Sequence, residues 1–402
     1  MNTKKLNTFT LSGLIIGPIL GSGVILLPPL LYDMLGNSSL ITWIGILCLG
    51  FVFALIFGKL AILFPGEAGV SLATKEAMGK KYQLLTSFYL ICAVFFGPVA
   101  VLLIAGQFIE EYFSNTSLVI LAFGIYVITY ILLLVKIDFL GKLMLIVSSA
   151  ITLIFLFSSI AVLLNTQEFI FSLPSMEIKQ MGYSFLLVFW AIVGWEVIGN
   201  YSNDVHDTQT LTKAVIFSVI IISLVYMLVA IAIVFGDFEH KNIEPFKLVW
   251  LIQPLFGIYS TTILALVSVT LCIGTLILFV GGVARLIASL HLTKFTSKHT
   301  ISGIPIGALN FLSLIYMITL YLVWIKLLSL DNLVAFADGF FIANAIIGLI
   351  TAIILFESGF LRYSAMILSA LFFAILLFSE LFILVIIAIL FIYTYFKKER
   401  NT

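Results

Sequence analysis

Long apolar segments recur along the whole chain, and they constrain the fold more than any other feature. A helix that crosses the hydrocarbon core of a bilayer needs about 20 mostly apolar residues. We therefore predict twelve membrane helices, near residues 9–31, 40–64, 83–109, 117–135, 143–164, 183–202, 213–236, 259–288, 305–326, 332–356, 363–378 and 380–396. These runs are continuous and too long for a transmembrane β-barrel, whose strands alternate apolar and polar residues over about 10 positions.

The composition excludes a soluble protein. Hydrophobic residues make up 62% of the chain and charged residues 10%, whereas soluble domains have roughly 45–50% and 25%. The formal charge of +1 gives no reason to expect a nucleic-acid partner. The three cysteines, Cys48, Cys92 and Cys272, lie inside apolar runs and predict no disulfide framework.

The basic residues predict the orientation. If the N-terminus is cytoplasmic, sixteen of the twenty Lys and Arg residues fall on the cytoplasmic side, and only Lys179, Lys241, Lys247 and Lys326 fall outside. Both termini are then cytoplasmic, and the first segment is an uncleaved span. The short loops cannot hold a soluble catalytic domain. The sequence contains no H-E-x-x-H motif, no Walker A loop and no G-x-S-x-G elbow, so we expect no enzyme activity, no cofactor and no metal site.

Two predicted spans contain residues that interrupt helices. The first holds Gly17-Pro18 and Gly21-Ser22-Gly23, and the sixth holds Gly194 two residues before Glu196. Unwound backbone at membrane depth is tolerated where it is buried in protein or lines a cavity. Small residues that merely allow close helix packing are the alternative explanation for each span alone. Together, such breaks at corresponding positions in two halves indicate a transporter binding site.

The predicted breaks suit a zwitterion. Freed N–H groups at a half-helix N-terminus favour a carboxylate, and freed carbonyls at the other end favour an ammonium group or a metal ion. Spans 1–5 (9–164) and 6–10 (183–356) form the two halves. Because each half has an odd number of spans, the second must be inverted, and a two-helix hairpin at 363–396 follows it.

Several motifs resemble those of the amino acid–polyamine–organocation (APC) transporters. They are Gly21-Ser22-Gly23-Val24, Trp190-x-x-x-Gly194-x-Glu196, Pro65-Gly66-Glu67-Ala68-Gly69, Ala284-Arg285-Leu286 and Ile304-Pro305. The segment Phe336–Ile342 and the short tails are most similar to the small bacterial exporters of methionine and branched-chain amino acids. The resemblance implies an all-α, five-plus-five inverted fold with discontinuous helices 1 and 6, alternating access, and a place in the bacterial cytoplasmic membrane.

The candidate site residues follow from the breaks and the resemblance. The expected substrate-binding residues are Ile19, Ser22, Gly23, Val24, Trp190, Val193 and Gly194. The candidates for gating or coupling are Glu196, Trp195 and Asp338, and the candidate ion ligands are Ser268, Thr270 and Thr275. A structural role for Glu196 and an outer-interface position for Asp338 remain alternatives. We interpret Asp204, His206 and Asp207 as a solvated turn and helix cap rather than metal ligands.

The resulting hypothesis is a secondary active transporter of neutral, hydrophobic amino acids, acting as a monomer or weak homodimer in the lipid bilayer. We expect an exporter coupled to an ion gradient, with proton coupling, sodium coupling and simple exchange all open. An importer or exchanger of the same superfamily is the nearest alternative. A sensor or channel that does not transport amino acids is the alternative from a different class.

Overall fold

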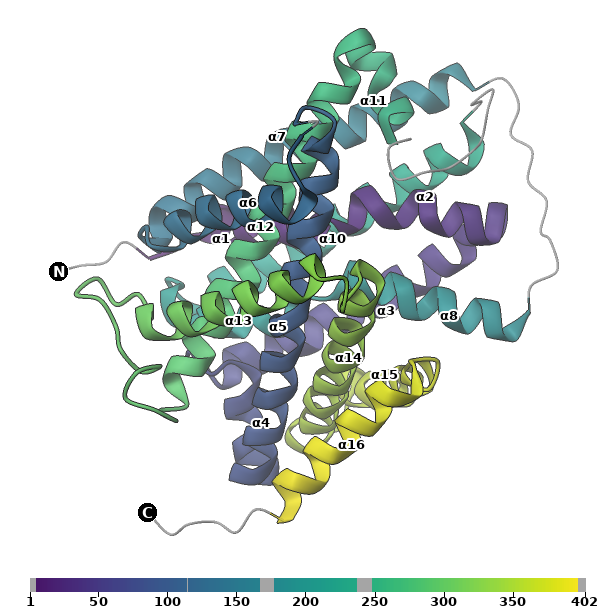
Figure 1. The fold of residues 1–402 in the computed structure, drawn as a ribbon. Helices are drawn as coiled ribbons and strands as arrows, with labels where there is room; N and C mark the ends of the chain where they lie inside the picture. Colours follow the sequence, from purple (N-terminus) through teal and green to yellow (C-terminus); the bar gives the residue numbers. More distant parts are fainter. Residues whose placement is uncertain (1–4, 114, 167–176, 237–247, 397–402) are drawn as a thin grey trace. The chain divides into compact units, whose positions relative to one another are not determined.

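The computed structural model describes residues 5–113, 115–166, 177–236 and 248–396 (Figure 1). The predicted outer basic residues Lys241 and Lys247, and both chain ends, lie outside these ranges. The described residues form helices and connecting turns, with no β-strand of more than a single bridge residue. The prediction of an all-α protein is therefore confirmed for the described part of the chain.

Eight helical stretches of the described chain are long and apolar enough to cross a membrane. They are Thr8–Leu63, Lys80–Glu110, Ile137–Asn165, Ile178–Asp204, Thr208–Phe235, Val249–Ser289, Ile306–Trp324 and Leu330–Leu355. Three shorter apolar helices are Leu118–Leu133, Phe360–Leu376 and Leu381–Phe396. The count of twelve crossings and the inverted repeat remain predictions.

The chain divides into two compact units. The first comprises Met1–Phe51, Val101–Gly194 and Lys213–Leu278, and the second comprises Val52–Ala100, Trp195–Thr212 and Phe279–Thr402. Helices that lie wholly in the first unit are α1 (Thr8–Leu20), α2 (Gly23–Leu35), η1 (Gly36–Ser38), α6 (Leu118–Leu133), α7 (Ile137–Asn165), α8 (Ile178–Val188), η2 (Phe189–Ile192), α11 (Val249–Phe256) and η5 (Gly257–Tyr259).

The remaining helices lie in the second unit or continue from one unit into the other. The second unit holds α4 (Val70–Met78), α9 (Trp195–Ile198), η3 (Gly199–Asp204), α13 (Ile306–Trp324), α14 (Leu330–Leu355), α15 (Phe360–Leu376) and α16 (Leu381–Phe396). Four helices contribute residues to both units: α3 (Ser39–Leu63), α5 (Lys80–Glu110), α10 (Thr208–Phe235) and α12 (Ser260–Ser289). The short helices α4 and α11 fall where the sequence predicted loops.

In the first unit, α1 packs along α7. A Cβ built on Gly13 would overlap the backbone of Leu145, and one built on Gly17 would overlap the Ser148 hydroxyl. That hydroxyl donates a hydrogen bond of 2.8 Å to the Gly13 carbonyl. The missing side chains of α1 therefore allow close backbone approach, as is common between membrane helices.

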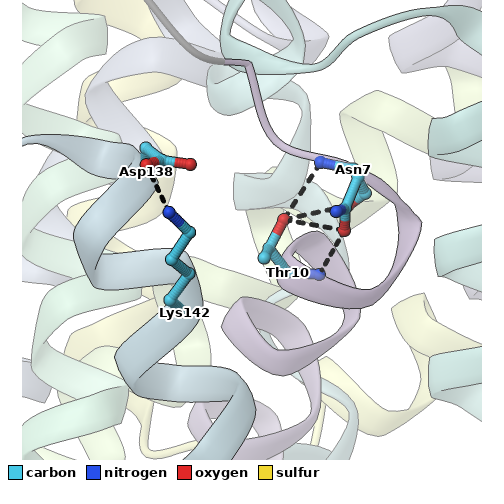
Figure 2. Close-up of polar contacts among 4 residues, drawn as sticks. All are labelled: Asn7, Thr10, Asp138 and Lys142. Carbon is cyan, nitrogen blue, oxygen red and sulfur yellow. Dashed lines mark hydrogen bonds and ion pairs between the residues drawn. The ribbon is translucent and has the colours of Figure 1, made fainter.

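The starts of α1 and α7 are both stabilised locally (Figure 2). Asn7 caps α1, since its side chain accepts the Thr10 N–H at 2.9 Å and the Thr10 hydroxyl accepts the Asn7 N–H at 3.0 Å. Such reciprocal caps contribute about 1 kcal/mol. On α7, Lys142 pairs with Asp138 one turn earlier at 2.9 Å. That exposed pair contributes only about 0.3–0.5 kcal/mol.

In the second unit, α14 packs against α4, α15 and α16 and is buried on all sides over its middle turns. Two of its polar side chains bond to other helices of the unit: the Thr86 hydroxyl donates to Asn344 at 2.7 Å, and Thr351 and Thr74 share a hydrogen bond of 3.0 Å. An inner helix of this kind can carry polar groups because its neighbours, rather than lipid, surround them.

Candidate functional site

The first helix is interrupted at Gly21 and Ser22, where the sequence predicts a break. The α1 helix ends at Leu20 and α2 begins at Gly23. Gly21 adopts φ 38° and ψ −142°, a conformation that side-chain-bearing residues rarely adopt. A Cβ at Gly21 would also overlap the Thr275 hydroxyl and the Pro18 carbonyl. The glycine is therefore required both by its backbone angles and by the space around it.

Hydroxyl groups from two other helices satisfy the carbonyls at the end of α1. Thr275 on α12 donates to the Pro18 carbonyl at 2.8 Å. Tyr226 on α10 donates to the carbonyls of Ile19 at 3.3 Å and Leu20 at 3.1 Å. Buried carbonyls at a helix end need such partners because no water reaches them. The carbonyls at this end of the break are thus bonded by side-chain hydroxyls of other helices rather than by backbone N–H groups.

The second predicted break lies between η2 and α9. Val193 leaves the helix in an extended conformation, with φ −70° and ψ 137°. Gly194 follows with φ 125°, again in the region that favours glycine, and α9 resumes at Trp195. The chain therefore interrupts the helix at the second position that the sequence predicts.

The first unit brings residues from both breaks together. The Trp190 indole N–H donates to the Ser22 hydroxyl oxygen at 3.1 Å. A Cβ built on Gly23 would contact Trp190 and would overlap the Tyr226 hydroxyl. Ser22, Gly23 and Trp190, three of the expected binding residues, thus form one cluster with Tyr226.

Ile19 and Val24 flank the first interruption, Val193 and Gly194 form the second, and all four are buried. Trp43, on α3, stacks on Tyr226 with ring centroids 5.0 Å apart and planes at 23°. Neither Tyr226 nor Trp43 was predicted as a site residue. The only signal for them is an aromatic residue inside an otherwise apolar span, which does not reveal its partners.

Two of the three candidate ion ligands share one face of α12, and the third lies on another face. Thr275 reaches the end of α1, and Ser268, seven residues earlier, is on nearly the same face because seven residues make almost two helical turns. Within the described part of the chain, the buried Ser268 hydroxyl has no hydrogen-bond partner. Thr270 is half-buried and donates to Leu266 of its own helix at 2.6 Å.

The candidates for gating or coupling belong to the second unit. Trp195 and Glu196 open α9, and the Glu196 side chain is 2% exposed. Asp338 lies in α14 and is 3% exposed. Both acids are therefore buried, whereas an outer-interface position for Asp338 would expose it more.

The second half of the sixth predicted span, α9 and η3, is tied to its surroundings in the second unit. The Ser202 hydroxyl accepts the Gly66 N–H at 2.7 Å. The Asn200 amide donates to the Gly282 carbonyl at 3.0 Å. The η3 turn therefore connects the Pro65–Gly69 segment to α12.

An ion pair strengthens the same connection. Arg285 Nε lies 3.3 Å from Asp204 Oδ2, and the two side chains are 17% and 29% exposed. The Arg285 guanidinium also lies 4.5 Å from the centre of the Tyr201 ring. This half-buried pair is worth more than a fully exposed one, because less water screens it.

Asp207 caps α10, as the sequence predicts. Its carboxylate accepts the Thr210 N–H at 2.7 Å and lies 3.0 Å from His206 Nδ1. The backbone N–H of Thr210 first, and His206 second, lower the Asp207 pKa to about 2. Across the described ranges, no three His, Cys, Asp or Glu residues are grouped as metal ligands would be.

Comparison with known proteins identifies the family. A family model described as amino acid permease matches residues 6–399. The L-methionine/branched-chain amino acid exporter YjeH of Escherichia coli (strain K12) is 22% identical over 342 residues, which cover 82% of this chain and 81% of that protein. The uncharacterized amino acid permease YecA of Bacillus subtilis (strain 168) is 22% identical over 358 residues, 83% of this chain and 81% of that protein.

Solved structures share the fold at low sequence identity. Two mutants of the manganese transporter of Eremococcus coleocola each superpose with a TM-score of 0.68 at 12% identity, covering 97% of this chain and 92% of theirs. At that identity the likeness concerns the fold alone. The family match over nearly the whole length carries the assignment: the chain belongs to the amino acid permease family and is a multi-pass membrane transporter of that kind.

Proposed function

We propose that the protein is a secondary active transporter of neutral, hydrophobic amino acids that works by alternating access. The observation that carries the proposal is the cluster of Ser22, Gly23, Trp190 and Tyr226 at two interrupted helices. It combines hydrogen-bond donors, acceptors and apolar surface, which are the three parts that an amino acid of this class requires. No charged side chain belongs to this cluster.

The start of α2 is the proposed site for the substrate carboxylate. The first N–H groups of a helix have no partner within it, and the helix dipole adds a partial positive charge. Ser22 precedes this helix but does not cap it with its side chain. Its oxygen accepts the Trp190 N–H, so its own proton remains available for a carboxylate oxygen. Gly23 has no side chain to cover the backbone here, and the Tyr226 hydroxyl that lies beside it would have to move when that oxygen binds.

The end of α1 is the proposed site for the substrate ammonium group. Three carbonyls lie at this end, those of Pro18, Ile19 and Leu20. In the substrate-free state the hydroxyls of Thr275 and Tyr226 donate hydrogen bonds to them. A hydroxyl can rotate and give up its acceptor at small cost, because it can donate elsewhere. An ammonium group brings three donors and a full charge, so it competes well for the same carbonyls.

The substrate side chain is proposed to be neutral and apolar. The substrate side chain would meet uncharged, apolar groups, because Ile19, Val24, Val193 and the Trp190 ring lie around the two breaks. A cationic or acidic substrate side chain would need a buried partner of opposite charge. The named relative that exports methionine and branched-chain amino acids supports this class and supports export as the direction. Coupling to an ion gradient is part of the proposal and does not rest on that relative.

Flux into proteoliposomes tests the proposal. The purified protein should exchange radiolabelled methionine, leucine, isoleucine or valine, and it should not exchange lysine or glutamate. Gly23→Leu should abolish this exchange and the thermal stabilisation by substrate, because its side chain would fill the space beside Tyr226. Gly124→Leu on α6 is the matched control, since a Cβ there meets nothing within 4 Å. No exchange of any amino acid by the wild type, or normal substrate stabilisation of Gly23→Leu, would contradict the proposal.

A further inference from the structure

Asp338 is a buried acid for which the described part of the chain supplies no hydrogen bond to Oδ1. Its side chain is 3% exposed. It forms no ion pair among those residues either. An unpaired charge buried in a membrane protein is so costly that such a group takes its neutral form. Asp338 is therefore a candidate to take up and release a proton when its surroundings change.

The neighbours of Asp338 along α14 make apolar contacts. Gly339 packs so closely on Ile383 of α16 that a Cβ would overlap it. Phe336, Phe340 and Phe341 make ring contacts with Phe96, Tyr89 and Phe279, on α5, α5 and α12. Because residue 336 pairs with 96 and residue 340 with 89, α5 runs antiparallel to α14, and Asp338 is level with residues near 92.

The titratable groups on the helices around α14 either contact other residues or lie far from the level of Asp338 along their helices. On α5, the Tyr89 hydroxyl donates to the Ile387 carbonyl at 2.9 Å, and Cys92 is a thiol that is neutral at physiological pH. Lys59 of α3 lies over the Phe356 ring, and Arg285 of α12 pairs with Asp204. The others are Lys75 and Glu76 on α4, Lys80, Lys81 and Tyr82 on α5, Arg362 and Tyr363 on α15, and Tyr393 and Tyr395 on α16.

The other polar residues of α14 show the contrast. Asn344 accepts the Thr86 hydroxyl, and Thr351 bonds to Thr74 and to its own helix. Both residues are uncharged and each makes at least one hydrogen bond, although the Asn344 Nδ2 atom has no partner among the described residues. They fit a structural role. Asp338 is ionisable, and within the described ranges no hydrogen bond reaches its Oδ1, so its contribution to stability as a fixed polar link is small.

We propose that Asp338 carries the coupling proton of the transport cycle, an inference that rests on the proposed function. On the side with the higher proton concentration, its carboxylate takes a proton from hydronium, which forms the neutral O–H group and leaves water. On the opposite side the O–H bond breaks, the proton returns to water, and the carboxylate remains until the next cycle. One proton therefore crosses for each substrate molecule, in the opposite direction when the substrate is exported.

Two assays on the full-length protein in proteoliposomes separate coupling from transport. Counterflow exchange of leucine at equal pH needs no net proton movement. Leucine accumulation driven by a pH difference needs it, and one proton per substrate supports up to about a tenfold accumulation per pH unit. A pH-sensitive dye in weak buffer reports the proton movement that leucine induces. The variants are Asp338→Asn and, as the matched control, Asp331→Asn, which changes an exposed acid of the same helix.

Asp338→Asn is expected to keep counterflow and to lose both pH-driven accumulation and the dye signal. Asp331→Asn should behave as the wild type. The inference is overturned if Asp338→Asn still accumulates leucine with the wild-type pH dependence, or if only Glu196→Gln abolishes the proton signal. It is also overturned if Asp338→Asn loses both substrate stabilisation and counterflow. If the Asn variant does not fold, Asp338→Ser is tested in its place by the same assays. An absence of counterflow in the wild type would instead defeat the proposed function itself.

Discussion

Removing the hydroxyl of Tyr226 tests the interpretation of the first helix break. The Tyr226→Phe change keeps the ring and its stacking on Trp43, at 5.0 Å. It removes only the donor shared by the Ile19 and Leu20 carbonyls, at 3.3 and 3.1 Å. Since one proton serves both acceptors, we count it as one shared hydrogen bond. Leaving a buried acceptor unsatisfied costs about 1–3 kcal/mol.

That cost converts to a measurable shift in melting temperature. The entropy of unfolding is about 2.1 cal/mol/K per residue. For a chain of 402 residues, the free energy of unfolding therefore changes by roughly 0.8 kcal/mol per degree near the melting temperature. The substrate-free Tyr226→Phe variant should therefore melt about 1–4 °C below the wild type. If the substrate ammonium replaces the hydroxyl, saturating leucine should restore part of this loss, and its stabilising shift should be larger in the variant.

Differential scanning fluorimetry in detergent, with and without leucine, measures both effects. Tyr321→Phe is the control, because Tyr321 is an exposed tyrosine of α13. The reasoning is refuted if Tyr226→Phe melts within 0.5 °C of that control, a limit set at about half the smallest expected shift. It is also refuted if leucine stabilises the variant no more than it stabilises the wild type, since the ammonium would then not use these carbonyls.

Two further predictions concern the second unit. Arg285→Gln and Asp204→Asn should each destabilise the protein by about 1–3 kcal/mol, because each leaves a half-buried charge unpaired. In thermal unfolding, the double variant should lose less than the two single losses combined, and strict additivity would exclude the pair as a stabilising contact. The low pKa of Asp207, about 2, predicts a stabilising contribution that is complete above about pH 4 and is lost as the pH falls toward 2. Asp207→Asn should remove this part of the acid sensitivity, and an unchanged stability profile from pH 5 to 2 would contradict the role of the cap.

The interruptions of the two helices were predictable from sequence because they depend on local backbone chemistry. Gly21 and Gly194 adopt backbone angles that other residues avoid, and Pro18 removes a backbone donor. The cap at Asp207 was predictable for the same reason. Each of these features depends on a few adjacent residues, so the sequence carries the whole signal.

The partners of the broken helix were not predictable in this way. Tyr226 and Thr275 lie about 200 and 250 residues from the carbonyls that they bind. Their spans are apolar on nearly every face, so hydrophobic periodicity does not indicate which side chain faces α1. The sequence predicted Thr275 only as one of three hydroxyls on a span, and Thr270, which looked equivalent, lies on a different face of α12.

The close fit of α1 against α7 limits how the first helix can move. Gly13 and Gly17 leave no side-chain layer between the two backbones, and Ser148 bonds across the contact. Tilting α1 alone would separate these surfaces and break that bond, whereas moving both helices together would keep them intact. The smallest mechanical element at this end of the first unit is therefore a pair of helices, which the two-residue link at Gly21 and Ser22 joins to α2.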